Sequence, residues 1–272
     1  MATDPRAPRV VALDFDGVVC DGRPEYFEAG WRAYRAAWPG AAGDSARTPA
    51  LAARFGALRP LIESGWEFPV LIHALLAGEG ERAFSDRAAW LETGRRLVAA
   101  AGVSADALGQ ALNRGRDEWF ARDPRDWVSH HAFYPGVAAM MERAQGAGVR
   151  VVVVTTKAER FARALLESVS PRLGALPVVG REPGRTVPKH ESLARLAQEH
   201  SLAEGDGLWF VEDLLETLED VAMRPQLGGA RLFLASWGYN VLEQRARASL
   251  HPRVTVISLG DVGRLLSSWP KG

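Results

Sequence analysis

The chain has 272 residues, of which 47% are hydrophobic and 24% are charged, a composition typical of a soluble globular protein with one large or two modest domains. Its 33 basic and 33 acidic residues balance, so no net charge favours nucleic acid or an anionic membrane as a partner. A single cysteine, Cys20, excludes an internal disulfide and indicates a reducing compartment. The first residues lack the apolar stretch of a secretory signal, and no run is long enough to cross a bilayer. We therefore expect a cytoplasmic protein.

The N-terminal part of the chain begins with one short strand. Residues 9–15 are rich in β-branched side chains and end in acids followed by Gly17, which is typical of a buried strand that leads into a tight turn.

Residues 24–121 contain no comparable strand pattern. Their aromatic side chains recur at helical spacing in the first part of the segment, at Tyr26, Phe27, Trp31, Tyr34 and Trp38. Helices are expected over 86–101 and 105–121, with Ser85 and Ser104 as their N-caps. The segment therefore predicts an all-helical domain inserted after the first strand.

Strands and helices alternate from about residue 132 to the end. The predicted strands are 149–155, 176–179, 208–211, 232–235 and 254–257, and the predicted helices are 136–146, 159–169, 189–200, 214–223 and 259–269. Such alternation indicates an α/β, Rossmann-like, doubly wound parallel sheet with helices on both faces. We predict a core formed by 1–20 and 131–272, and a helical cap formed by 21–130.

Two acids, Asp14 and Asp16, end the first predicted strand. Ligands bind at the carboxyl ends of strands in open parallel sheets, and alternate residues of a strand can share one side. The alternatives are a calcium-binding loop or an acidic surface turn. A calcium loop of the EF-hand type needs its glycine at the sixth position, whereas Gly17 is at the fourth position counted from Asp14.

Three further groups of polar residues follow later strands. Thr155 and Thr156 end a valine-rich strand and offer a hydroxyl and backbone N–H groups to an anion, Lys189 opens a helix, and Glu212-Asp213 follow an apolar strand. Each has a structural alternative, as an N-cap, a solvated charge or an acidic first helical turn. Their order along one sheet edge favours a single site.

These motifs resemble those of the haloacid dehalogenase superfamily over nearly the whole chain. The four stretches that carry the resemblance are Asp14-Phe15-Asp16-Gly17-Val18, Thr155-Thr156-Lys157 with its valine-rich strand, Lys189, and Val211-Glu212-Asp213. The helical insert is similar to the mobile cap of a subclass that includes phosphoglycolate phosphatases and β-phosphoglucomutases. The segment 236–240 resembles the one that follows the fifth strand in phosphatase members.

The resemblance implies a magnesium-dependent phosphohydrolase that acts on a small phosphorylated metabolite, either phosphoglycolate-like or a sugar phosphate. Asp14 would be the nucleophile that forms an aspartyl-phosphate, and Asp16 the general acid and base. Thr155, Thr156 and Lys189 would bind the phosphoryl oxygens, with Thr155 and Lys189 also counted as catalytic. Mg²⁺ would be held by oxygens of Asp14, Asp16 and Asp213, with help from Glu212.

One position departs from the family pattern. Many relatives carry a second acid four residues after the first acid of the fourth motif. Here Glu216 stands four residues after Glu212, while Thr217 stands four residues after Asp213. We favour Asp213 as the metal ligand.

Other chemistries of the superfamily fit less well. Halide leaves without a proton and superfamily dehalogenases lack an acid at the position of Asp16, so Asp16 favours phosphoryl substrates. Phosphonoacetaldehyde hydrolases need a cap lysine for a Schiff base, yet no lysine precedes Lys157. The open alternatives are a phosphomutase, which uses the same motifs, and a non-catalytic binding protein with the same fold.

The cap offers candidates for substrate specificity. Arg59, Trp66 and Glu67 fall in a dense polar and aromatic stretch, and a cap of this size can close over a small substrate. The alternative is that the charges lie on solvated helix faces and that Trp66 belongs to the core.

Overall fold

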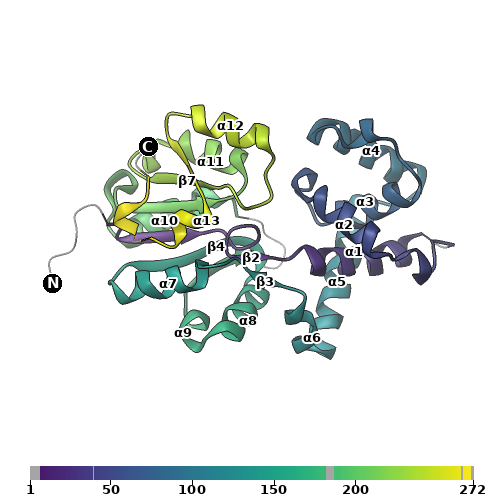
Figure 1. Ribbon diagram of the computed structural model, residues 1–272, viewed down its shortest axis with the longest axis horizontal. Coiled ribbons are helices and arrows are strands. Elements are labelled where there is room, and N and C mark those ends of the chain that lie inside the picture. The colour runs from purple at the N-terminus through teal and green to yellow at the C-terminus, as the bar shows by residue number, and fades with distance from the viewer. Residues whose placement is uncertain (1–6, 39, 182–186, 265, 271–272) are drawn as a thin grey trace. The chain divides into compact units, whose positions relative to one another are not determined.

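The computed structural model describes residues 7–38, 40–181, 187–264 and 266–270 (Figure 1). It divides into two compact units, one formed by Met1–Asp21 with Ala132–Gly272 and the other by Gly22–His131. The division lies one residue after each boundary expected from the sequence. We call these units the core and the cap, and each is described by itself.

The core contains a parallel six-stranded sheet with the order β5-β4-β1-β6-β7-β8. This confirms the predicted Rossmann-like architecture, in which β1 lies between strands that come much later in the chain (Figure 1). The strands are β1 (Val10–Leu13), β4 (Arg150–Ala158), β5 (Val178–Arg181), β6 (Leu208–Glu212), β7 (Arg231–Ala235) and β8 (Val254–Ile257).

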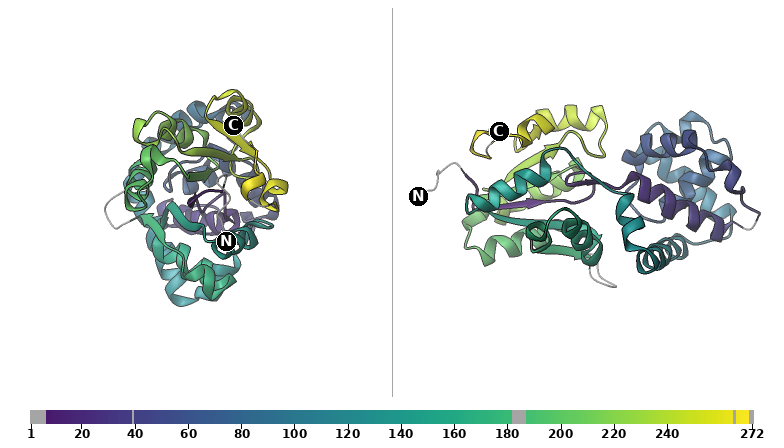
Figure 2. Two further views of the ribbon diagram at one scale, coloured as in Figure 1. Left: turned by 90° about the vertical axis from the view of Figure 1, so that its left-hand side faces the viewer. Right: turned by 60° about the horizontal axis from the view of Figure 1, so that its bottom comes forward.

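Helices cover both faces of this sheet because its side chains are apolar on both sides. Alternate residues such as Val10, Val152 and Phe210 share one buried cluster with residues of α10 (Lys189–Glu199), α11 (Leu215–Ala222) and α12 (Leu242–Leu250). Helices α7 (Val137–Gly146), α8 (Glu159–Val169) and α9 (Pro171–Gly174) lie together on the other face, as Figures 1 and 2 show.

A short antiparallel pair of strands lies where the chain leaves the core for the cap and where it returns. Strand β2 (Cys20–Asp21) pairs with β3 (Ala132–Phe133), and the Phe133 ring meets the ring of Phe15 edge-on at 6.2 Å. The sequence analysis did not predict this pair, because two-residue strands are too short for an alternating pattern to be visible.

The cap contains only helices among its described residues, as predicted (Figure 2). Helix α1 packs on α3 and α5, with the rings of Tyr26 and Phe68 stacked at 5.0 Å. The helices are α1 (Arg23–Ala37), α2 (Pro49–Ala57), α3 (Glu67–Leu76), α4 (Arg87–Ala100), α5 (Ala105–Arg122) and α6 (Pro124–Ser129), with 3-10 turns at Asp44–Ala46, Arg59–Leu61 and Glu81–Phe84.

Two helix predictions need correction. Asp86, not Ser85, caps α4, because its carboxylate accepts the N–H of Ala89 while the Ser85 hydroxyl donates to Asp86. The helix expected over 259–269 is only a short α13 (Leu259–Val262), which ends at Gly263 and is followed by a 3-10 turn over Leu266–Ser268. Ser104 caps α5 as predicted. Within the described ranges, every helix is too short or too polar to cross a membrane.

Candidate active site

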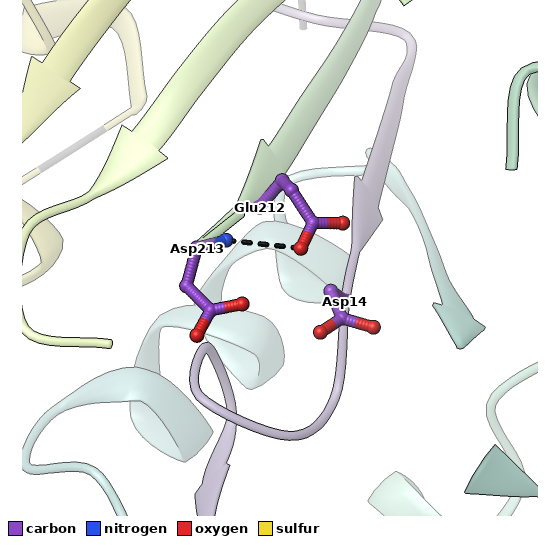
Figure 3. Close-up of side chains that lie close together, drawn as sticks. All are labelled: Asp14, Glu212 and Asp213. Atoms are coloured by element: carbon purple, nitrogen blue, oxygen red, sulfur yellow. Dashed lines mark hydrogen bonds between the residues drawn. The ribbon is translucent and has the colours of Figure 1, made fainter. Parts of the chain in front are cut away.

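Asp14 follows the last residue of β1 and is the first member of a buried acidic cluster. Its backbone N–H donates to the carbonyl of Val211 at 2.9 Å, which continues the β1–β6 pairing and fixes where the side chain begins. The residue is 5% exposed. Its carboxylate lies with those of Glu212 and Asp213, one oxygen of each within 4.8 Å of the others (Figure 3).

Lys189, the first residue of α10, neutralises part of this cluster. Its Nζ lies 2.7 Å from Oδ1 of Asp14 and 2.6 Å from Oε2 of Glu212. Burial alone would lower the pKa of the Lys189 ammonium, but the two carboxylates outweigh this effect and raise that pKa. Lys189 therefore stays charged. Its position beside Asp14 agrees with the sequence analysis, which expected the two residues in a single site.

Glu212 and Asp213 end β6 and begin the loop before α11. Oε1 of Glu212 accepts the backbone N–H of Asp213 at 3.2 Å (Figure 3). The same oxygen accepts the N–H of Leu214 at 3.1 Å, while the other oxygen binds Lys189. Both Glu212 oxygens are thus engaged within the protein. Glu216, the acid considered from the family pattern, instead contacts Gln244 on the outer side of α11.

Two glycines leave room for the Asp213 side chain. A Cβ atom on Gly17, whose φ is +94°, would lie 2.0 Å from Oδ2 of Asp213, and one on Gly238 would lie 2.2 Å from Cβ of Asp213. The same carboxylate oxygen accepts the backbone N–H of Tyr239 at 2.6 Å, and the Asn240 side chain donates to the Asp213 carbonyl. Segment 238–240 therefore fixes Asp213.

The cluster holds its acids close together. Three buried carboxylates lie within 4.8 Å of one another, and two of them, those of Asp14 and Glu212, contact the Lys189 ammonium. Burial raises the pKa of Asp14 to about 7 and that of Glu212 to about 7, although Lys189 lowers both in part. A buried all-oxygen donor set of three clustered carboxylates fits a hard divalent cation such as Mg²⁺. The residues present therefore fit the metal that the resemblance implies.

Asp16 lies beside this cluster but contacts a different cation. Lys157 places its Nζ 3.1 Å from Oδ1 and 3.3 Å from Oδ2 of Asp16. The side chains of Lys157 and Asp16 are 7% and 20% exposed. The sequence analysis named Lys157 within the second motif but gave it no role. Its position two residues after Thr155 was the available signal, because residues i and i+2 of a strand share a side.

Comparison with known proteins agrees with this arrangement. A family model described as haloacid dehalogenase-like hydrolase matches residues 8–219. The chain belongs to the haloacid dehalogenase-like hydrolases. A comparison with curated proteins gives no significant match.

Solved structures share the fold of this hydrolase at low sequence identity. A predicted phosphatase of Clostridium acetobutylicum is 13% identical, with a TM-score of 0.61 over 94% of this chain and 97% of that one. A predicted phosphoglycolate phosphatase of Haemophilus somnus is 14% identical, with a TM-score of 0.56 over 86% and 88%. A Thermotoga maritima protein, provisionally assigned as a β-phosphoglucomutase, is 16% identical, with a TM-score of 0.54 over 94% and 96%. At these identities the likeness shows the fold alone.

Thr155 and Thr156 of the hydrolase do not lie at a helix N-terminus, where the sequence analysis expected them. Strand β4 runs on to Ala158 and α8 begins only at Glu159, so Thr155 and Thr156 belong to the strand, in a part where its pairing with β5 shifts. Thr155 is buried and its Oγ1 accepts the N–H of Lys157 at 3.1 Å, whereas Thr156 is exposed. Phosphate binding by either residue stays a prediction.

The three cap residues named for specificity have contacts inside the cap. Glu67 is fully buried, accepts the indole N–H of Trp90 at 2.7 Å and pairs with Arg87. Trp66 covers Gly94, where a Cβ would lie 3.5 Å from its ring, and Arg59 donates to the Ile62 carbonyl at 2.7 Å. These contacts give Glu67 and Trp66 structural roles, and a substrate role for any of the three stays a prediction.

Proposed function

We propose that this hydrolase is a Mg²⁺-dependent phosphatase that cleaves a phosphate monoester of a small metabolite through an aspartyl-phosphate on Asp14. The observation that carries the proposal is the buried cluster of Asp14, Glu212 and Asp213, with Lys189 in contact with Asp14 and Glu212. Family membership supports hydrolysis, and the acid Asp16 near this cluster supports a leaving group that needs a proton.

Asp14, Asp213 and the backbone carbonyl of Asp16 would hold Mg²⁺, and Glu212 would assist by holding Lys189. Such an ion supplies Lewis-acid stabilisation of the phosphoryl oxygens and offsets the repulsion between an anionic nucleophile and a phosphate dianion. Lys189 adds a fixed positive charge beside Asp14. Because that ammonium is buried and held by two carboxylates, it is oriented before substrate arrives.

In the first step, a carboxylate oxygen of Asp14 attacks phosphorus and forms a new O–P bond. The P–O bond to the ester oxygen breaks, and its electron pair stays on that oxygen, which takes a proton from the Asp16 carboxyl group. The products of this step are a free alcohol and an aspartyl-phosphate on Asp14.

In the second step, water attacks the phosphorus and gives its proton to the Asp16 carboxylate. The O–P bond to Asp14 breaks, and the electron pair returns to the Asp14 carboxylate. The sum is one ester and one water converted to one alcohol and one inorganic phosphate. Proton transfer of this kind contributes roughly 10²–10⁴-fold to the rate.

The experiment is an assay of phosphate release from a panel of small esters, each with Mg²⁺ and with EDTA. The panel includes phosphoglycolate, hexose and triose phosphates, nucleoside monophosphates and a chromogenic ester. We expect Mg²⁺-dependent release with a clear preference for one ester. Absence of release from every ester by a protein that still binds Mg²⁺ would contradict the proposal.

A phosphomutase is the second candidate, since it would use the same nucleophile and acid. The fold shared with a provisionally assigned β-phosphoglucomutase keeps this alternative open. It would be indicated if a sugar bisphosphate is needed to start turnover and the product is an isomer with little free phosphate.

A further inference from the structure

Lys157 is a second buried ammonium of the core, and it contacts the proposed acid Asp16 instead of the nucleophile. The chain has three lysines, and the third, Lys271, lies outside the described residues. The two described lysines are therefore divided between the two carboxylates that the proposed reaction uses, Lys189 on Asp14 and Lys157 on Asp16.

The backbone around Lys157 fixes where its side chain starts. The pairing of β4 with β5 shifts between Val154 and Ala158, and such an irregularity re-aims side chains at the end of a strand. The Lys157 N–H donates to Oγ1 of Thr155 at 3.1 Å. On β5, a Cβ atom at Gly180 would lie 2.9 Å from the Lys157 carbonyl, so glycine permits the close approach of the two strands here. Contacts on β4 and on β5 thus both restrict the backbone of Lys157.

The contact with Asp16 places this ammonium near the leaving group. A general acid must come within about 2.6–3.2 Å of the oxygen that it protonates. Because Nζ of Lys157 lies 3.1 Å from Asp16, a leaving oxygen bound to Asp16 would be within about 6 Å of the ammonium. The phosphoryl group already has Lys189 as a counter-charge, whereas Lys157, in contact with Asp16, lies within reach of a charge on the rest of the substrate.

We infer that Lys157 selects phosphate esters whose leaving group carries an anionic group close to the ester oxygen, in the simplest case the carboxylate of a short hydroxy acid. The inference rests on the proposed phosphatase function and narrows its substrate class. When such an ester binds, the Lys157 ammonium exchanges its contact with Asp16 for one with the substrate anion. Asp16 then turns to the leaving oxygen. A substrate without this anion leaves Asp16 paired with Lys157.

The reach of the ammonium limits the substrate further. An ammonium within about 6 Å of the ester oxygen can bind a carboxylate only if few atoms separate the two groups. Esters of two- to four-carbon hydroxy acids satisfy this limit, because their carboxylate lies about the length of one extended residue from the ester oxygen. A second phosphoryl group at the same distance offers the same charge, and the assay below separates the two anions.

The test compares short phosphate esters that differ in the charged or neutral group on the leaving alcohol. The values of kcat/KM are measured for 2-phosphoglycolate, for the bisphosphate of ethylene glycol, and for 2-hydroxyethyl phosphate, in which a hydroxymethyl group replaces the carboxylate. Each is measured with the wild-type chain, Lys157→Gln, Lys157→Arg and Arg163→Gln. Arg163→Gln is the control. It also removes one positive charge, but from a side chain that binds Glu159 on α8.

We expect the wild type to prefer an anionic ester over 2-hydroxyethyl phosphate, and the better of the two anionic esters identifies the anion. Lys157→Gln should lower kcat/KM for that ester about 100-fold, the effect of losing one charge-assisted contact in a buried site, and lower it less than about 5-fold for 2-hydroxyethyl phosphate. Lys157→Arg should restore most of the preference, and Arg163→Gln should leave it unchanged.

Equal losses for charged and neutral esters in Lys157→Gln would overturn the inference, since they would mean that Lys157 only orients Asp16. A wild type that hydrolyses both kinds of ester equally well would overturn it too, without need of a variant that folds, and would leave the phosphatase proposal standing. Failure to hydrolyse any ester would overturn the phosphatase proposal and this inference with it.

Discussion

The core and the cap each bury three carboxylates among their described residues, but they neutralise them differently. In the core, Asp14, Glu212 and Asp213 form one cluster, in which Asp14 and Glu212 share the ammonium of Lys189. In the cap, each buried acid pairs with at least one arginine, in the pairs Glu25–Arg116, Glu28–Arg32 and Glu67–Arg87.

Two of the cap acids also accept indole N–H groups. Glu67 accepts from Trp90 at 2.7 Å, and Glu25 accepts from Trp127 at 3.4 Å. These are balanced structural pairs that hold helices together. The difference shows that a buried acid alone does not indicate a site. A cluster of buried acids does, because like charges held close together favour a bound cation.

The largest effect expected is that of Asp14→Asn on turnover. Loss of the nucleophile should lower kcat by at least about 10⁴-fold, as for other nucleophiles that act as part of a unit. The fold should persist, since the amide is neutral and nearly the same size. Phosphate release measures the activity, and circular dichroism checks the fold. Activity within tenfold of wild type would refute the role of Asp14.

The cap acids should instead matter for stability. Glu67→Gln leaves Arg87 and the Trp90 indole without their buried carboxylate, and should lower the free energy of unfolding by about 3 kcal/mol. Denaturant unfolding measures the change. Asp106→Asn is a surface control, because it removes an exposed acid of α5. Equal stability of Glu67→Gln and this control would mean that the pair is not structural.

Stabilisation by Mg²⁺ should depend on pH. In the metal-free chain the pKa values of Asp14 and Glu212 are raised to about 7, so their contribution to stability is lost as the pH rises through that value. Mg²⁺ needs both groups ionised and must displace protons at lower pH. Its stabilising effect should therefore be about 2 kcal/mol larger near pH 8 than near pH 6. Thermal unfolding with Mg²⁺ and with EDTA measures this, and equal effects at both pH values would refute it.

The smallest expected effect is a gain in stability when a core acid is neutralised, opposite in sign to the loss expected for the cap acid Glu67. In EDTA, Asp213→Asn removes one negative charge from the cluster of buried acids and should raise the free energy of unfolding by up to about 1 kcal/mol. The same change should abolish stabilisation by Mg²⁺. Thermal unfolding of the variant provides both values. A destabilised variant that still responds to Mg²⁺ would contradict the proposed role of Asp213.

Much of this arrangement could be predicted because its signals are local. The apolar strands that end in Asp14 and Asp213 needed only alternation and the rule that parallel strands share an edge. Lys189 could be assigned because it opens a helix that follows another strand. The parallel sheet and the helical insert follow from the same patterns.

The remaining features depend on contacts between distant parts of the chain. The spacing of Lys157 from Thr155 gives only the side of the strand on which it lies. It does not show that Lys157 reaches Asp16, 141 positions earlier, and nothing local indicates that Gly238 makes room for Asp213. Glu67 and Trp66 looked like substrate residues because polar and aromatic side chains crowd one stretch. Only the packing of α3 against α4 reveals that Glu67 meets Arg87 and Trp90.

The most direct test of the account is to look for the phosphoryl group on Asp14. The Asp16→Asn variant is mixed with Mg²⁺ and p-nitrophenyl phosphate, whose phenolate leaves without a proton, then quenched in acid and digested for peptide mass spectrometry. We predict that one phosphoryl group accumulates on the peptide that contains Asp14, because the variant lacks the base that activates water. Hydrolysis by the wild type, with no phosphoryl group on that peptide in either protein, would contradict the account.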